Sequence, residues 1–343
     1  MDSQTVYVLF LLFFAVSTLG QLYLSLRQSR AVLRHRGAVP AAFADTVTLA
    51  EHQKAADYSL VKQRFSRYEI VFQAALLWLF TLGGGLNVLA LLSQKLVAST
   101  LWQGVVLLGL FGLVSMVLGW PWALYRTFVL EARFGFNQTT LPTWLADQFK
   151  GVLLALIIGT PLLLAVVYLM GAMGKLWWLY VWLLWLGFSL LLLWAFPKWI
   201  APLFNKFEPL ADSALQARIE SLLQRTGFKS KGVFVMDGSK RSGHGNAYFT
   251  GLGQNKRIVF FDTLLKDMRP QEVEAVLAHE LGHFAHKHII KQMAVTFALA
   301  LTVLFVLGLL LPQPAFYSGL GVDYPGHAMA LLLFLLVLPV FTF

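Results

Sequence analysis

Residues 176–197 read LWWLYVWLLWLGFSLLLLWAFP, a run of 22 residues without one charged side chain. A helix that crosses a bilayer needs about 20 mostly apolar residues, so this run is long enough to span a membrane. Six more uncharged runs of at least 20 residues lie at 3–26, 70–94, 96–125, 151–174, 292–322 and 324–343. The sequence therefore predicts a mainly α-helical, polytopic membrane protein with seven transmembrane helices, the last one cut off at Phe343.

Nearly all of the positively charged residues lie in alternate loops between these runs. The net charge is +10, which by itself is compatible with binding to nucleic acid. However, 25 of the 27 Lys and Arg residues lie in 27–69, 126–150 and 197–291. This asymmetry is typical of cytoplasmic loops, so the charge indicates topology and a lipid bilayer as partner, with no role for nucleic acid. The chain has no Cys, which excludes disulfides and thiol catalysis.

The distribution of polar residues predicts three regions. Residues 1–200 form an N-terminal membrane domain with five spans, 201–291 form the only sizeable polar region, and 292–343 hold the sixth span and a truncated seventh. The polar region is expected to be a small α+β domain that carries the chemistry.

Local signals inside the polar region predict its elements. Asp212-Ser213 can cap a helix that buries apolar residues, and residues 233–235 are typical of a short strand. Residues 246–250 and 257–262 predict two strands joined by a turn rich in Gly and Asn. Pro270 is expected to begin a helix that continues into the sixth span.

That last helix contains the motif His279-Glu-Leu-Gly-His283, an instance of HExxH. Positions i and i+4 share one face of a helix, so His279 and His283 can bind one zinc ion. Glu280 can reach the water bound to the metal and is the predicted general base and acid. The pattern predicts zinc-assisted hydrolysis of a peptide bond.

Catalytic zinc takes three protein ligands, and the sequence does not settle the third. No further Glu follows the motif. On an unbroken helix His286 would be collinear with the pair, and His288 would point to another face. Asp323 and His327 are expected on the far side of the membrane, which leaves His244 as a possible substitute.

The chain resembles the type I CAAX prenyl protease family, which are integral-membrane zinc metalloendopeptidases. The resemblance covers nearly the whole chain and is carried by the HELGH motif together with three further segments. They are Glu131-Ala-Arg-Phe-Gly-Phe-Asn137 followed by Thr140, Asn246-Ala-Tyr-Phe249, and Lys256-Arg-Ile-Val259 through Asp262-Thr-Leu264.

The resemblance implies a fold and a substrate. It implies seven helices around a large intramembrane chamber, with a zincin-like catalytic domain whose zinc site faces that chamber. It also implies that Asn246 and Ala247 lie on an edge strand that pairs with the substrate backbone, as in strand addition. The family's third ligand is a Glu after the seventh span, so we expect this chain to be part of a longer enzyme.

Three alternatives remain at this point. The family substrate is a protein with a prenylated C-terminal CaaX box, cleaved before its last three residues, but the same site could serve membrane protein quality control. With two ligands, the chain could also be a non-catalytic membrane scaffold. A transporter is disfavoured because the spans carry almost no intramembrane charge. The membrane is expected to be the bacterial inner membrane or the endoplasmic reticulum, with the catalytic loop cytoplasmic.

Overall fold

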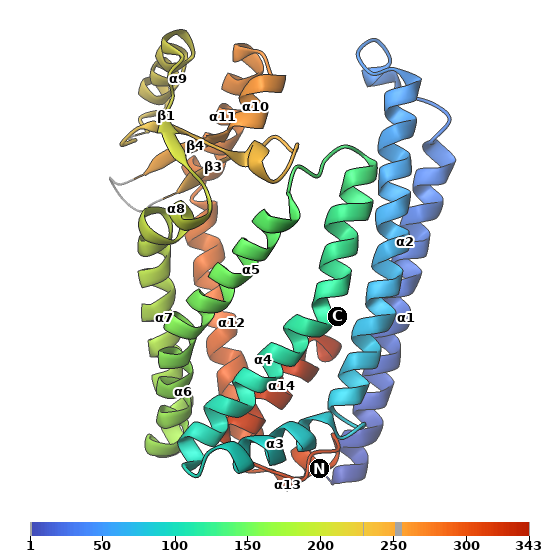
Figure 1. Ribbon diagram of the computed structural model, residues 1–343, viewed down its shortest axis with the longest axis vertical. Helices are drawn as coiled ribbons and strands as arrows, with labels where there is room; N and C mark the ends of the chain where they lie inside the picture. Colours follow the sequence, from blue (N-terminus) through green and yellow to red (C-terminus); the bar gives the residue numbers. More distant parts are fainter. Residues whose placement is uncertain (1, 229, 251–255, 343) are drawn as a thin grey trace. The chain divides into compact units, whose positions relative to one another are not determined.

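The computed structural model describes residues 2–228, 230–250 and 256–342 (Figure 1). The chain divides into two compact units. The first consists of Met1–Leu130, Leu163–Lys175 and Val306–Phe343, and the second of Glu131–Leu162 and Leu176–Phe305.

All regular elements in the described residues of the first unit are helices. Its helices are α1 (Ser3–His35), α2 (Leu49–Phe80), α3 (Gly85–Leu96), α4 (Thr100–Tyr125), most of α6 (Thr160–Ala172), α13 (Pro314–Ser318) and α14 (His327–Phe341). The side chain of Asp2 caps α1, and a capping box between Thr48 and Glu51 begins α2. Each cap satisfies amide groups that have no partner within the helix.

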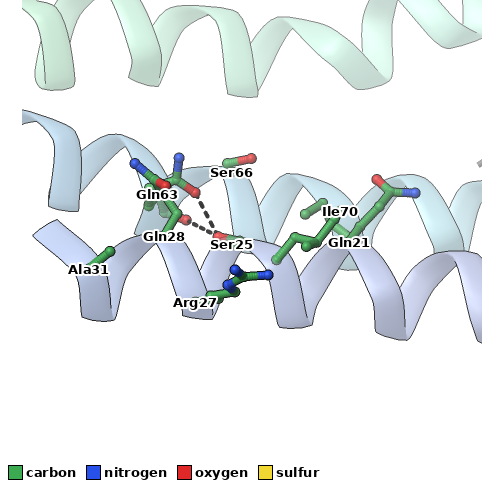
Figure 2. Close-up of a pocket in the computed structure, with 9 residues that line it drawn as sticks. Gln21, Ser25, Arg27, Gln28, Ala31, Gln63, Ser66 and Ile70 are labelled. Atoms are coloured by element: carbon green, nitrogen blue, oxygen red, sulfur yellow. Dashed lines mark hydrogen bonds between the residues drawn. The ribbon is translucent and has the colours of Figure 1, made fainter.

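Helices α1 and α2 lie side by side and are joined by polar contacts. Ser25 Oγ donates to Gln63 Oε1 at 2.8 Å, and Arg67 Nη1 donates to Ser29 Oγ at 2.9 Å. Figure 2 shows the Ser25–Gln63 contact at the wall of an open pocket lined by residues of both helices. Serine is small, so its presence on α1 lets the two backbones approach closely, as in many membrane helix pairs.

The predicted span over 70–94 contains a break in its helix, so one continuous helix over these residues is not formed. Helix α2 ends at Phe80, α3 begins at Gly85, and their axes differ by 55°. Gly84 has φ +77°, a conformation that favours glycine. A Cβ on Gly83 or Gly85 would lie 2.7 Å or 2.9 Å from the carbonyl oxygen of Leu79, so the glycine run permits the break.

Five described helical segments are long and apolar enough to cross a membrane, or six if α2 and α3 form one bent span. The five are Ser3–His35, Thr100–Glu131, Leu141–Ala172, Gly174–Phe204 and His288–Leu310. Helix α14, which occupies the predicted seventh run, has 15 residues. A mainly α-helical polytopic protein is therefore confirmed, whereas the count of seven spans stays a prediction.

The second unit contains a four-stranded sheet with the order β1-β2-β4-β3. The strands are β1 (Phe207–Pro209), β2 (Val233–Met236), β3 (Ala247–Thr250) and β4 (Arg257–Phe261). Strands β2 and β4 are parallel, and the other two pairs are antiparallel. The predicted hairpin strands are confirmed, but residues 251–255 of their predicted turn lie outside the described part of the chain.

The second unit also contains the following helices: α5 (Leu141–Leu154), α7 (Trp177–Ala195), α8 (Ala201–Phe204), α9 (Ser213–Thr226), α10 (Asp262–Asp267), α11 (Pro270–Ala285) and most of α12 (His288–Leu310). Helix α9 confirms the sequence prediction: Asp212 caps its first turn, and Gly227 with φ +65° ends it. Helices α9 and α11 pack on the sheet through a shared apolar core. That core consists of Leu210, Leu215, Ile219, Leu222, Leu223, Phe228, Ile258, Phe260, Leu264, Val273, Leu277 and Leu281.

The expectation that the helix from Pro270 runs on into the sixth span is wrong. Helix α11 ends at Ala285, and α12 begins at His288. Between them Lys287 has φ +53°, in the left-handed region where a helical hydrogen-bond ladder cannot continue.

We predict that Gly104→Ala destabilises the first unit. A Cβ at Gly104 of α4 would lie 2.9 Å from Ala328 Cβ of α14 and 3.2 Å from Val167 Cγ1 of α6. Overpacking of this kind costs about 1–3 kcal/mol. The control is Gly109→Ala on the same helix, where no atom lies within 4 Å of the added Cβ. Without a clash, this change stabilises the helix by about 0.5–1 kcal/mol. Thermal unfolding in detergent measures both, and shifts of the same sign would contradict the packing.

Candidate metal centre and strand edge

Helix α11 presents two histidines on the side away from the core. Val273, Leu277 and Leu281, four residues apart, are buried against α9 and the sheet. His279 and His283 are exposed, and their Nε2 atoms lie 3.2 Å apart. The i, i+4 spacing predicted from the sequence therefore brings the two ring nitrogens together.

The separation of these two nitrogens fits a shared zinc ion. Tetrahedral zinc binds histidine nitrogen at about 2.0–2.1 Å, which places two such ligands about 3.3–3.4 Å apart. Glu280 lies between them in sequence and is half-buried. In the part of the chain that the structure describes, no group of three His, Cys, Asp or Glu residues could hold a metal.

The structure places the other candidate ligands elsewhere. His244 Nε2 lies 3.5 Å from Glu131 Oε2, and its ring stacks on Phe136 with centroids 4.1 Å apart. Asp323 belongs to the first unit and accepts a hydrogen bond from Asn87 Nδ2 at 2.8 Å. His327 is the first residue of α14, also in the first unit. None of the three joins the histidine pair in a described three-residue group.

His288 does not point to another face, as the sequence predicted for a continuous helix. Its Nδ1 lies 2.9 Å from Nδ1 of His283. The helix breaks at Lys287, so His288 no longer has the position that a continuous helix would give it. Sequence analysis missed this contact because neither Gly nor Pro marks the break.

Strand β3 forms one edge of the sheet. In the described residues it pairs with β4 alone. The carbonyl oxygen of Asn246, just before β3, accepts from the amide of Phe261 at 2.9 Å. Orientation alternates along a strand, so the backbone groups of Ala247 and Phe249 face the free edge. Consistent with this, the amide of Ala247 donates to Oδ1 of Asn246 at 2.9 Å instead of to β4.

The loop 131–140 contacts the turn that leads into β3. The amide of Gly243 donates to the carbonyl oxygen of Phe136 at 2.8 Å, and the amide of Gln138 donates to that of Arg241 at 3.1 Å. Thr139 Oγ1 also donates to the Arg241 carbonyl, at 3.0 Å. The first matching segment, Glu131–Asn137, therefore helps to position the start of the edge strand.

The segment after β4 holds the same turn from the other side. Asp262 Oδ1 accepts from the amide of Ser239 at 2.8 Å, and Asp262 Oδ2 accepts from its hydroxyl. Thr263 Oγ1 donates to the carbonyl oxygen of His244 at 3.0 Å. All three segments that carry the resemblance thus meet around the turn 238–245, which sequence spacing alone could not show.

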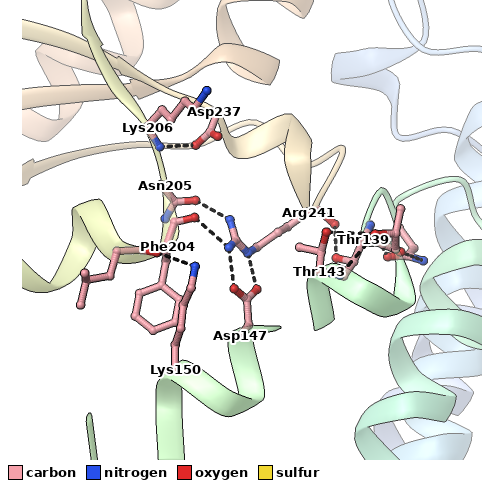
Figure 3. Close-up of polar contacts among 12 residues, drawn as sticks. Thr139, Thr143, Asp147, Lys150, Phe204, Asn205, Lys206, Asp237 and Arg241 are labelled. Carbon is pink, nitrogen blue, oxygen red and sulfur yellow. Dashed lines mark hydrogen bonds and ion pairs between the residues drawn. The ribbon is translucent and has the colours of Figure 1, made fainter. Parts of the chain in front are cut away.

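Arg241 ties this turn to α5 and to the end of α8 (Figure 3). Its Nε and Nη2 donate to both carboxylate oxygens of Asp147 at 2.7 and 2.8 Å. Nη1 donates to Asn205 Oδ1 at 2.7 Å, and Nη2 also donates to the Phe204 carbonyl at 2.8 Å. Hydrogen bonding to Asp147 raises the pKa of Arg241 above its usual value.

The fold and this site together define a polytopic membrane protein with an HExxH helix beside an open sheet edge. The family model described as "CAAX prenyl protease N-terminal, five membrane helices" matches residues 28–206, and "Peptidase family M48" matches 209–340. The chain therefore belongs to peptidase family M48, among the CAAX prenyl proteases.

Individual relatives agree with this assignment. "CAAX prenyl protease 1" of Saccharomyces cerevisiae is 36% identical over 79% of the chain and 62% of its own length. The homolog of Dictyostelium discoideum is 31% identical over 92% of the chain and 75% of its own length. The homolog of Homo sapiens is 31% identical over 91% of the chain and 74% of its own length. The chain thus matches less than two thirds of the yeast protein. The chain also superposes on the crystal structure of S. mikatae Ste24p with a TM-score of 0.90 and 29% sequence identity. The superposition includes 98% of this chain and 82% of the Ste24p chain.

We predict that Arg241→Ala lowers the free energy of unfolding of the second unit by about 1–3 kcal/mol. The substitution leaves a half-buried Asp147 carboxylate without its bidentate partner, and such charge-assisted bonds stabilise more than neutral ones. Arg269→Ala is the control, because its side chain is 80% exposed in its pair with Glu272. That pair contributes less than about 1 kcal/mol. Chemical denaturation compares the two variants, and equal losses would contradict the role of Arg241.

Proposed function

We propose that the chain provides the catalytic helix and the peptide-binding strand of a membrane-embedded zinc metalloendopeptidase. The observation that carries the proposal is the 3.2 Å separation of the His279 and His283 Nε2 atoms, with Glu280 on the same helix. Membership in peptidase family M48 supports it.

Each residue of the motif has a distinct role in this proposal. His279 and His283 hold one zinc ion through Nε2. Zinc held there would supply Lewis-acid polarisation of the scissile carbonyl and would acidify a water molecule. Glu280 accepts the proton of the attacking water and then donates it to the amine nitrogen that leaves. A Glu beyond Phe343 as third ligand stays a prediction from the resemblance.

The free edge of β3 is the proposed site for the substrate backbone. Ala247 and Phe249 offer outward amide and carbonyl groups, so an extended peptide can add to the sheet as a further strand. In the free protein the Ala247 amide donates a hydrogen bond to Asn246 Oδ1. The Asn246 side chain must therefore rotate away before this amide can donate to a bound peptide. Main-chain pairing of this kind accepts many sequences, so selectivity must come from side-chain contacts.

The proposed substrates are proteins with a prenylated C-terminal CaaX box, cleaved before the last three residues. The names of the yeast, amoebal and human relatives support this class over membrane protein quality control. A non-catalytic scaffold is the alternative if the chain alone provides only two zinc ligands. The seven-helix chamber and the zincin-like architecture of the polar unit remain expectations from the resemblance.

The chain is an integral, multi-pass membrane protein. We further propose that its basic loops, including the catalytic one, face the cytoplasm. The membrane is then the bacterial inner membrane or the endoplasmic reticulum, and the bilayer is an obligatory partner.

We predict that Glu280→Gln lowers hydrolysis of a farnesylated CaaX peptide by about 100- to 10,000-fold, the usual contribution of a general base. Gln is isosteric but cannot accept the proton, so zinc content measured by elemental analysis should be unchanged. A Glu280→Gln variant with wild-type turnover would refute the mechanism.

The same peptide without its farnesyl group separates the two substrate classes. Prenyl recognition predicts much faster cleavage of the farnesylated form by the wild-type protein. Equal rates for both peptides would favour quality control over CaaX processing, and absence of cleavage of either peptide would favour the scaffold.

We predict that Ala247→Pro folds normally but lowers kcat/KM about tenfold. Proline removes an amide that faces the free edge and takes no part in the β3–β4 ladder. The bonds lost are the local one to Asn246 Oδ1 in the free protein and the one to the substrate. Tyr248→Pro is the matched control, because the Tyr248 amide faces β4 and its loss destabilises the sheet. Steady-state kinetics and thermal unfolding of both variants test the assignment, and it fails if Ala247→Pro leaves kcat/KM unchanged.

A further inference from the structure

The junction between α11 and α12 has an unusual backbone. Lys287 is the one residue other than glycine with positive φ, +53°, in the described part of the chain. Residues with a Cβ avoid this conformation, and where it occurs it often serves a functional geometry. The junction lies four residues after the second histidine of the HExxH motif.

The left-handed residue determines which side chains meet. On a continuous helix, residues five apart lie about 7.5 Å apart along the axis and about 140° around it, so His283 and His288 could not touch. When a helix ends in a left-handed residue, the residue after it folds back over the last turn. Here α11 ends at Ala285, Lys287 is the left-handed residue, and His288 reaches His283.

The contact between the two rings has a defined chemistry. The Nδ1 atoms of His283 and His288 lie 2.9 Å apart, so one must donate a hydrogen and the other accept it. His283 directs Nε2 toward Nε2 of His279, where the zinc is proposed to bind. A ligand nitrogen must be unprotonated, so the proton of His283 resides on Nδ1 and is donated to His288.

We infer that His288 is a positioning residue for the metal centre. It accepts the Nδ1 proton of His283 and thereby fixes the tautomer and the ring orientation that direct Nε2 to the metal. The left-handed Lys287 is the backbone device that brings it there. Partners of this kind in other zinc sites are usually carboxylates or carbonyl groups. This inference rests on the zinc site of the proposed function.

The neighbouring His286 provides a matched control. Its ring stacks on that of His288 with centroids 5.6 Å apart and an angle of 20°. His286 is exposed, and the inference assigns it no hydrogen bond to either proposed ligand. A general effect of removing a histidine from this cluster would therefore appear in His286→Ala as well.

The experiment measures zinc affinity of the full chain in detergent by competition with a chelator. We expect His288→Leu to bind zinc about 10- to 100-fold more weakly than wild type, the range for loss of such partners. His288→Asn should recover most of the affinity, because its Oδ1 can replace Nδ1 as acceptor. His286→Ala should bind like wild type.

The role of the backbone is tested at Lys287. Isoleucine disfavours the left-handed region and glycine adopts it freely, so Lys287→Ile should bind zinc more weakly than Lys287→Gly. Equal affinity of His288→Leu and wild type would overturn the inference and leave the zinc site intact. Failure of wild type to bind zinc more tightly than His279→Ala would overturn the proposed function and the inference together.

Discussion

Within a bilayer, every backbone amide and carbonyl must find a partner inside the protein, and the rest of this structure depends on that constraint. It explains the long helical segments, in which each turn satisfies its own groups. At the break between α2 and α3, the hydroxyl of Thr81 donates to the carbonyl of Leu77 at 2.6 Å, and glycines allow the close turn.

In the polar region 201–291, side chains provide partners for backbone groups that lie outside the strands and α-helices. The turn 238–245 has no regular strand or helix beyond a short helical turn, and it precedes the proposed substrate strand. Hydrogen bonds join this turn to three other segments. Its Arg241 side chain donates to Asn205 Oδ1, and its Ser239 amide donates to Asp262 Oδ1. Its Gly243 amide donates to the Phe136 carbonyl in the loop 131–140. This explains in physical terms why the segments that resemble the CAAX prenyl proteases include residues far from HExxH, because they hold the edge strand in place.

Much of this organisation could be predicted from the sequence. Residues 213–226 alternate apolar and polar side chains with helical spacing between a cap and a glycine, and they form α9 as expected. The pairing of β3 with β4 followed from two apolar runs near in sequence. The glycine run at 83–85 permits the bend between α2 and α3 but does not specify its angle. The break at Lys287 could not be predicted, because neither Gly nor Pro marks it.

The sequence by itself determined the membrane class, the α+β composition of the polar region 201–291 and the proximity of His279 and His283, because hydrophobic length and helical spacing are local properties. Only the tertiary structure shows that His244 Nε2 lies beside the Glu131 carboxylate and that Ala247 lies on the free edge of the sheet. It also shows that His288 contacts His283. These depend on where separate elements meet and on one left-handed residue, and no periodicity in the chain encodes either.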